Sequence, residues 1–312
     1  MIEPDPDWYG TYARRSALAD YLEVLALSGQ SMSRAELADR IRDSGWVEIL
    51  GERIGIPAEP ALGDATNLAE ELDLADLRAQ DVLAVVQERQ DAAGERYPFA
   101  TDNNGRLTFM SPHDPEGLPY VRLLCLALAH SVQLATERKP YLVFEDVVSV
   151  ALGESGLAVA GLGAYGRGPG VFAQALVDAC VAVGLQAYPE NALARVFAND
   201  EGADVLVNVW HHDSRPGGQQ LIGQVTCAKS DDWDRKIMEP KPDQWRDWLG
   251  KMRRPAAFLA VPHHVDAVTR AWLMGNRDRD VVDRIRLCGL MSEQRCEGEA
   301  DIVDKVLAEE VV

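Results

Sequence analysis

Residues 202–229 read GADVLVNVWHHDSRPGGQQLIGQVTCAK. Two apolar runs flank the turn-forming sequence SRPGG, so the stretch predicts an antiparallel β-hairpin. Side chains alternate between the two faces of a strand, and Ile222, Gln224 and Thr226 therefore share one face. Burying an amide without partners costs roughly 1–3 kcal/mol. Gln224 is either a core amide that has hydrogen-bond partners or part of a functional site.

Two further polar residues bracket this hairpin. Asp204 opens the first strand, and Lys229 follows the second. Carboxylate and carbonyl oxygens suit Mg²⁺ (or Mn²⁺), which keeps several water ligands available for hydrolysis. A nearby lysine can orient the attacking water or stabilise a charged transition state. The hairpin therefore predicts a metal-dependent phosphodiester hydrolase site; the alternative is that Asp204 caps the strand and Gln224 belongs to the core.

The elements around the hairpin predict an α/β sandwich with a mixed sheet. Helical patterns at 141–152 and 171–185 precede runs with strand character at 194–200, 203–210, 219–228 and 256–262. A charged helix that contains tryptophan, 244–252, comes before the last of these runs. Two helices followed by several strands are typical of a sandwich and not of an alternating barrel.

The first part of the chain is predicted to be mainly helical. Residues 13–43 read as two amphipathic helices, with Ser33 as the cap of the second and Glu36 completing a capping box. This pair is either a helical hairpin or a helix-turn-helix. A helix over 76–93, a hairpin over 96–110 and an apolar helix over 120–135 follow. The turn-rich residues 111–119 suggest two domains, 1–115 and 116–312.

The hairpin resembles the PD-(D/E)xK, or restriction-endonuclease-like, nuclease superfamily. EGADVLVNVW (201–210) resembles the strand that opens with the metal-binding Asp, and LIGQVTCAK (221–229) resembles the next strand in the branch with Gln in place of Glu. The resemblance covers about residues 140–290. It implies a core of helix, three-stranded mixed sheet, helix and strand, with Asp204 and Gln224 at the metal and Lys229 completing the catalytic set.

The sequence departs from the superfamily pattern in its lysine. The pattern places lysine two residues after Gln224, where this chain has Thr226. Lys229 must then reach back from the strand end, and Lys236 is the second choice. A helical glutamate often completes the metal site in the superfamily, and Glu145 is the metal ligand that we assign, with Glu190 as an alternative.

A longer pattern resembles uncharacterised bacterial phage-defence proteins. It consists of Gly-Gln at 223–224, Lys229, Trp233 with Lys236 three residues on, and later DRIRL at 283–287. This resemblance implies a DNA endonuclease that forms one component of an anti-phage system. The alternative is a nuclease fold that has lost hydrolysis and serves as a scaffold or sensor subunit with a partner protein.

The net charge of −19 constrains any nucleic-acid function. The chain as a whole repels DNA, so binding requires a local basic patch, a divalent metal or a partner. The densest basic cluster contains Lys251, Arg253 and Arg254, which we predict to contact the phosphate backbone. We also expect a protein partner or a homo-oligomer. Five isolated cysteines, no long apolar run and no signal-peptide pattern predict a cytoplasmic protein.

Three other patterns favour different functions less strongly. Gly161-x-Gly163-x-x-Gly166 fits a dinucleotide-binding loop, hence an oxidoreductase, but the glycines continue to Gly170 and no repeating βα units follow. Histidine pairs at 211–212 and 263–264 lack the spacing of a zinc site. Trp233, Trp245 and Trp248 could stack on bases, although tryptophans at this spacing more often anchor a helix on a core.

Overall fold

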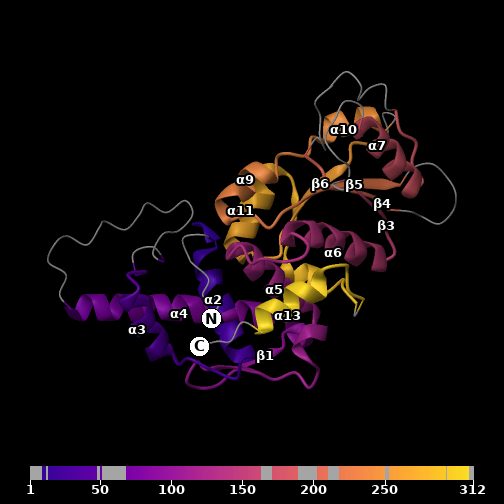
Figure 1. Ribbon diagram of the computed structural model, residues 1–312. Coiled ribbons are helices and arrows are strands. Elements are labelled where there is room, and N and C mark those ends of the chain that lie inside the picture. Colours follow the sequence, from indigo (N-terminus) through magenta and orange to yellow (C-terminus); the bar gives the residue numbers. More distant parts are fainter. Residues whose placement is uncertain are drawn as a thin grey trace.

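A computed structural model describes residues 9–11, 13–47, 50, 68–162, 171–188, 202–209, 218–249, 253–292 and 294–308 (Figure 1). The mixed α/β class with a helical N-terminal region is confirmed. In the N-terminal part the elements are α2 (Arg14–Leu27), α3 (Arg34–Asp43), α4 (Leu68–Ala93), η2 (Gly94–Arg96), β1 (Phe99–Thr101), β2 (Leu107–Phe109) and η3 (Pro115–Gly117).

The second part of the chain carries the larger sheet. Its elements are α5 (Pro119–Ser131), α6 (Pro140–Glu154), β3 (Ala158–Gly161), α7 (Val171–Ala182), β4 (Val205–Val209), β5 (Gln219–Val225), η4 (Ser230–Asp232), α9 (Trp233–Lys236), α10 (Pro242–Trp248), β6 (Ala256–Ala260), α11 (Ala267–Arg277), β7 (Asp280–Val282), α12 (Arg284–Cys288) and α13 (Glu299–Ala308). The expected strand at 194–200 lies outside the described residues.

The larger sheet has the strand order β3-β4-β5-β6-β7. Strand β4 runs antiparallel to both neighbours, whereas β5, β6 and β7 are parallel. The predicted hairpin is confirmed, with Val205 opposite Gly223 and Val209 opposite Gln219. The start of β4 therefore lies at the same edge of the sheet as the carboxyl ends of β5 and β6.

Helices cover both faces of this sheet (Figure 1). On one face, α7 and α10 pack on Leu206, Ile222 and Ala257. On the other, α6 packs on a core that includes Val207 and Val225. The alternation of strand side chains accounts for this division, since successive residues of β4 and β5 enter different cores.

The expected N-terminal elements are present. The Ser33 hydroxyl accepts a hydrogen bond from the Glu36 N–H, and the Glu36 carboxylate accepts one from the Ser33 N–H, which completes the capping box. The hairpin β1–β2 forms around residues 102–106. One hydrophobic core contains residues from α2 and α4 together with residues from α5, α6 and the sheet. The division of the chain into 1–115 and 116–312 stays a prediction.

A buried ionic network joins the N-terminal helices to the end of the sheet. It contains Asp20 and Glu23 of α2, Arg89 of α4 and Arg284 of α12, all with essentially no exposed surface. Arg284 donates to both carboxylate oxygens of Asp20, over 2.7 and 3.0 Å. Burial alone would raise the pKa of Asp20, but the two guanidiniums hold it below its ordinary value. Two cations and two anions thus balance inside the protein.

Candidate functional site at the β4–β5 edge

Asp204 lies at the head of β4, where its backbone is held on both sides. Its N–H donates to the Gly223 carbonyl over 2.8 Å, and its carbonyl accepts from the Leu162 N–H over 2.6 Å. Its side chain is buried, with 6 % of the residue exposed. These bonds fix the carboxylate at the edge of the sheet where β5 ends.

Gln224 makes direct contact with that carboxylate. Its Nε2 donates to Asp204 Oδ2 over 2.7 Å, and the Val225 N–H donates to the same oxygen over 2.7 Å. The two side chains therefore meet on one face of the sheet, across the antiparallel pairing of β4 and β5. Gln224 is 5 % exposed, so the contact lies in a largely water-free setting.

The amide oxygen of Gln224 is left without a donor. Gln224 Oε1 is buried and accepts no hydrogen bond from any residue that the structure describes. Gln220, on the same face of β5, also has a buried Oε1 without a donor, but its Nε2 faces Asn208 and the Gly218 carbonyl. What distinguishes Gln224 is the carboxylate beside it, which provides a second oxygen of the kind that divalent cations bind.

Glycine at 223 explains how this strand packs. A Cβ atom at Gly223 would lie 2.2 Å from the ring of Phe258, its partner on β6. A larger residue would push the ring out of the core and shift the strand that carries Gln224. The Gly-Gln pair thus combines a close approach on one face of the sheet with a polar contact on the other.

Lys229 is exposed and lies beyond the end of β5. No hydrogen bond or ion pair among the described residues joins it to Asp204 or Gln224. Thr226, at the position where the superfamily has lysine, is buried, and its hydroxyl accepts from the Ala228 N–H over 3.1 Å. The structure therefore brings two of the three expected catalytic residues together and leaves the lysine outside their contact.

Lys236 is connected through Glu239 to the segment that precedes Asp204. Gly202, two residues before Asp204, has φ +72°, and a Cβ there would lie 2.5 Å from the backbone of Glu239. Glu239 in turn accepts from Lys236 Nζ over 3.0 Å. The residues that follow α9 thus pack against the segment that leads into Asp204. Glu239 was absent from the expected site, because its contact with Gly202 spans distant parts of the chain.

Glu145 comes from α6, which covers the face opposite to Gln224. It is half-buried, and burial together with the Glu145 charge raises the pKa of the Cys227 thiol just past β5. This places Glu145 within electrostatic range of the end of β5. Its role as a metal ligand stays a prediction. Glu190 lies outside the described residues.

The basic cluster lies at the other edge of the sheet. Arg253 and Arg254 are exposed and precede β6, whereas Gln224 lies beside Leu259 near the carboxyl end of that strand. At about 3.3 Å per residue, the separation along the strands is roughly 16 Å. Arg254 pairs with Asp243 over 3.2 Å. Lys251 lies outside the described residues, and contact with nucleic acid stays a prediction for all three basic residues.

Trp233, Trp245 and Trp248 are buried and pack in the protein core. Trp245 and Trp248 lie against Phe172 of α7, and Trp233 lies against His263. Their side chains anchor helices on the core and are not available to stack on bases. His263 and His264 are also buried, and burial lowers the pKa of both. Histidines 211–212 lie outside the described residues.

Strand β3 ends at Gly161, the first glycine of the dinucleotide pattern, and its pairing bears on that interpretation. Its neighbour β4 is antiparallel, whereas a dinucleotide-binding unit needs a parallel β-α-β arrangement. Gly163 and Gly166 lie outside the described residues. The described part of the fold gives no support to an oxidoreductase site.

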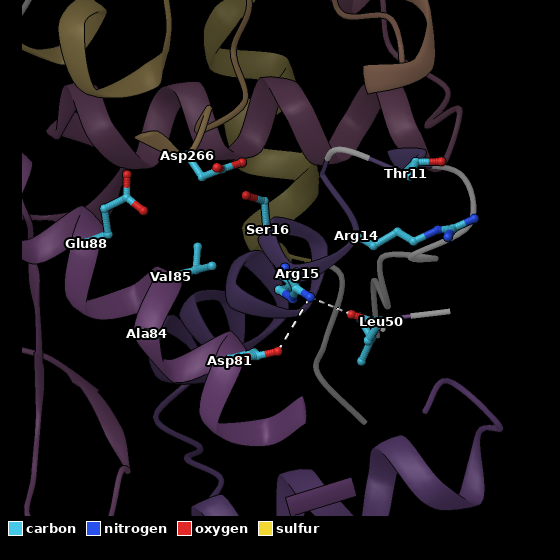
Figure 2. Close-up of a pocket in the computed structure, with 10 residues that line it drawn as sticks. All are labelled: Thr11, Arg14, Arg15, Ser16, Leu50, Asp81, Ala84, Val85, Glu88 and Asp266. Carbon is cyan, nitrogen blue, oxygen red and sulfur yellow. Dashed lines mark hydrogen bonds and ion pairs between the residues drawn. The ribbon is translucent and has the colours of Figure 1, made fainter. Parts of the chain in front are cut away.

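A hollow of about 220 Å³ lies between α2, α4 and the start of α11 (Figure 2). Arg15 pairs there with Asp81 over 3.5 Å and donates to the Leu50 carbonyl over 2.8 Å. Its lining residues belong to the N-terminal part of the chain, except for Asp266 at the N-cap of α11, and they do not include the Asp204–Gln224 pair.

Within the described part of the chain, no group of three or more His, Cys, Asp or Glu side chains is close enough to hold a metal ion. A site made of one carboxylate and one amide falls outside that description. The same residues include no helix with the length and apolar character needed to cross a membrane. No protein-family model, curated protein or solved structure matches the chain.

Proposed function

We propose that this protein is a metal-dependent nuclease of the restriction-endonuclease-like kind, which hydrolyses DNA. The observation that carries the proposal is the buried contact between Gln224 and Asp204, with the amide oxygen of Gln224 left without a donor. We further propose that it works in the bacterial cytoplasm as a component of an anti-phage system, as the resemblance implies.

The order of elements supports the proposal. The resemblance implies helix, three strands, helix and strand. The elements α6, β3, β4, β5, α10 and β6 occur in that order, with α7 inserted between β3 and β4 and the short η4 and α9 between β5 and α10. Asp204 opens the second of these strands, and Gln224 lies near the end of the third. The two residues on which the resemblance rests are also the two that touch.

The oxygens at this edge fit a hard divalent cation. Asp204 and Gln224 would hold Mg²⁺ or Mn²⁺, and Glu145 is the next candidate. The donor set suits these ions, because Mg²⁺ is usually bound through one or two carboxylates with water and substrate phosphate at its other positions. When bound, the ion would lower the pKa of a water molecule and neutralise charge on the scissile phosphate.

The protein's own groups prepare this arrangement. The N–H of Val225 orients the Asp204 carboxylate, so that its position does not depend on the cation. A lysine, Lys229 or Lys236, would stabilise the charge that develops on the phosphate. Lys229 follows β5 in the chain, and Lys236 pairs with Glu239, whose backbone lies against Gly202. Contact between either lysine and the scissile phosphate would form only with substrate bound.

A second candidate function is a scaffold or sensor subunit that has lost hydrolysis. The exposed position of Lys229 and the burial of Thr226 favour it, because the usual position for the lysine is filled by a hydroxyl. Two donors also occupy Asp204 Oδ2. Such a subunit would still need the fold, and its partner would supply the basic surface that this acidic chain lacks.

The decisive experiment compares the wild type with Asp204→Asn. Asparagine can still accept hydrogen bonds from Gln224 and Val225, so the fold should survive while the negative charge on the metal site is lost. Supercoiled, linear and single-stranded DNA and RNA are incubated with Mg²⁺, Mn²⁺ or chelator. Asp91→Asn, an exposed residue of α4, removes the same charge far from the site.

Cleavage by the wild type and by Asp91→Asn, dependent on the metal and abolished in Asp204→Asn, supports the nuclease. Equal residual cleavage in all three proteins would mean a contaminating enzyme and no support. Absence of cleavage under every condition, also with the products of neighbouring genes added, favours the scaffold.

A further inference from the structure

The segment that leaves β5, residues 226–232, is here called the strand exit, and it carries Lys229. The Thr226 N–H donates to the Ala260 carbonyl, which extends the pairing of β5 with β6 by one bond. Beyond this point the described backbone bonds of the strand exit are local, as in the bond from the Asp232 N–H to the Lys229 carbonyl. Its position must come from other contacts.

Side chains from outside the segment provide two of these contacts. Trp233 Nε1 donates to the Ala228 carbonyl over 3.0 Å. His263 Nε2 lies 3.4 Å from the Cys227 carbonyl, a distance and partner that fit a hydrogen bond donated by the imidazole. The His263 ring packs against Trp233, with centroids 5.8 Å apart. Two buried rings therefore hold the backbone immediately before Lys229 by hydrogen bonds to its carbonyls.

The N-terminal segment Tyr9–Thr11 contacts the strand exit at Ser230 and Asp231, the two residues that follow Lys229. Ser230 Oγ donates to the Tyr9 carbonyl over 2.7 Å, and the Thr11 N–H donates to Asp231 Oδ1 over 2.8 Å. Between these bonds Gly10 has φ +78°, and a Cβ there would lie 2.8 Å from the Asp231 carboxyl carbon. About 220 residues of sequence separate the two segments. They pack so closely that a methyl group would not fit at Gly10.

Tyr9 itself is anchored in the buried ionic network. Its hydroxyl donates to Asp20 Oδ2 over 3.1 Å, and its ring meets His263 edge-on at 5.2 Å. Tyr9, His263 and Trp233 thus form a continuous contact from Asp20 to the strand exit. The N-terminal helices reach the edge of the sheet by this route.

We propose that Tyr9–Thr11 is a positioning element for the candidate site, which fixes the strand exit and thereby the place of Lys229 relative to Asp204 and Gln224. The consequence for activity rests on the proposed nuclease function. The mechanical part of the proposal, that Tyr9–Thr11 holds the strand exit in place, does not depend on that function.

The test uses Asp231, whose exposed carboxylate accepts the Thr11 N–H. Asp231→Ala removes the acceptor, whereas Asp231→Asn loses the same charge and keeps an acceptor oxygen. Asp232→Ala is the matched control, because its carboxylate pairs with Arg235 and does not touch Tyr9–Thr11. Hydrogen exchange of peptides covering 226–233 is measured on the full chain without metal or nucleic acid.

Asp231→Ala should speed exchange in these peptides by about tenfold, while Asp231→Asn and Asp232→Ala stay near the wild type. Peptides from β4 should be unchanged in all variants. Equal exchange in Asp231→Ala and wild type overturns the proposal, and so does equal acceleration in Asp231→Ala and Asp232→Ala. Tyr9→Phe, with Tyr97→Phe as a control that also removes a phenol bond to the network, gives an independent second pair.

Activity is the separate readout. If the wild type cleaves DNA, Asp231→Ala should lower kcat by about tenfold and leave the Mg²⁺ concentration at half activity unchanged, since Asp204 and Gln224 are untouched. Asp231→Asn should restore kcat. An unchanged kcat in Asp231→Ala overturns the positioning role. If the wild type cleaves nothing, the nuclease proposal fails. The exchange result alone then supports or overturns the proposal that Tyr9–Thr11 holds the strand exit in place.

Discussion

Gln224 donates its side-chain amide to Asp204 across the β4–β5 hairpin, at 2.7 Å and in a buried setting. A buried carboxylate that accepts a bond from a glutamine need not be a metal site, because a satisfied polar pair can also fix the register of a hairpin. The two possibilities differ in what happens when the amide becomes a second carboxylate.

Gln224→Glu should make the protein dependent on a divalent cation. Without metal, two carboxylates would meet at the present donor–acceptor distance, and the variant should lose roughly 2–4 kcal/mol of stability, about 5–10 °C in Tm. If the pair is a metal site, Mg²⁺ should restore most of this loss. Thermal melts with Mg²⁺ and with chelator measure the difference.

Gln220→Glu is the matched control, since Gln220 is buried on the same strand face and its neighbour is Asn208 instead of a carboxylate. It should be destabilised whether or not Mg²⁺ is present. Equal behaviour of the two variants would mean that Gln224 is a structural amide, and the nuclease proposal would lose its central residue.

Asp204 should be needed for stability as well as for chemistry. Asp204→Ala leaves the Val225 N–H and the Gln224 amide without their acceptor and should cost about 2–4 kcal/mol, whereas Asp204→Asn should cost less because it keeps an acceptor. Urea unfolding of the two variants measures the order. Similar losses would show that the charge of Asp204, and not its hydrogen bonds, stabilises the fold.

The hairpin could be predicted because both of its signals are local. Apolar alternation and the turn sequence specify β4 and β5, and a period of two then puts Asp204 and Gln224 on one face. Strands β3 and β7 were not predicted as strands, since they have four and three residues and are defined by pairing with distant segments.

The contacts around the site were beyond sequence reasoning for a related reason. Glu239 meets Gly202, and Asp231 meets Thr11, only after the chain has folded. Arg284 was likewise not expected inside the protein, because a charge pattern does not show which arginine will find buried carboxylates. Its two carboxylate partners belong to α2, at the far end of the sequence.

Mutation of the two candidate lysines should identify the one that acts in catalysis. Lys229→Ala should lower the cleavage rate by about 10²–10³-fold if the strand exit supplies the electrostatic stabiliser, and Lys236→Ala should do so if α9 supplies it. Arg235→Ala is the control for Lys236, because both cations pair with Glu239. Normal rates in both lysine variants would exclude either lysine as the stabiliser and strengthen the scaffold function.

Nucleic-acid affinity and metal binding should be separable. The isolated chain should bind duplex DNA weakly at physiological salt, because its charge of −19 opposes a few basic residues. Joint replacement of Arg253 and Arg254 by alanine should weaken that binding further and leave the Mg²⁺ response of Tm unchanged, since these residues lie at the opposite edge of the sheet. Fluorescence anisotropy over a salt series measures the affinity; tight binding that resists salt would contradict the expectation.

Stability should fall as the pH drops below neutrality, because two buried histidines are held neutral. Burial, opposed in part by the charge of Asp20, lowers the pKa of His263 from 6.5 to about 4, and burial also lowers that of His264. The unfolded chain therefore takes up protons that the folded protein refuses between about pH 6.5 and 4, and ΔG of unfolding must decrease over that window as the pH falls. The loss should reach roughly 3 kcal/mol for His263 alone.

The variant His263→Gln tests this cause, because glutamine can keep a donor for the Cys227 carbonyl without titrating. Its free energy of unfolding in urea should therefore vary less between pH 7 and 4.5 than that of the wild type. A profile parallel to the wild type would show that His263 does not cause the acid sensitivity.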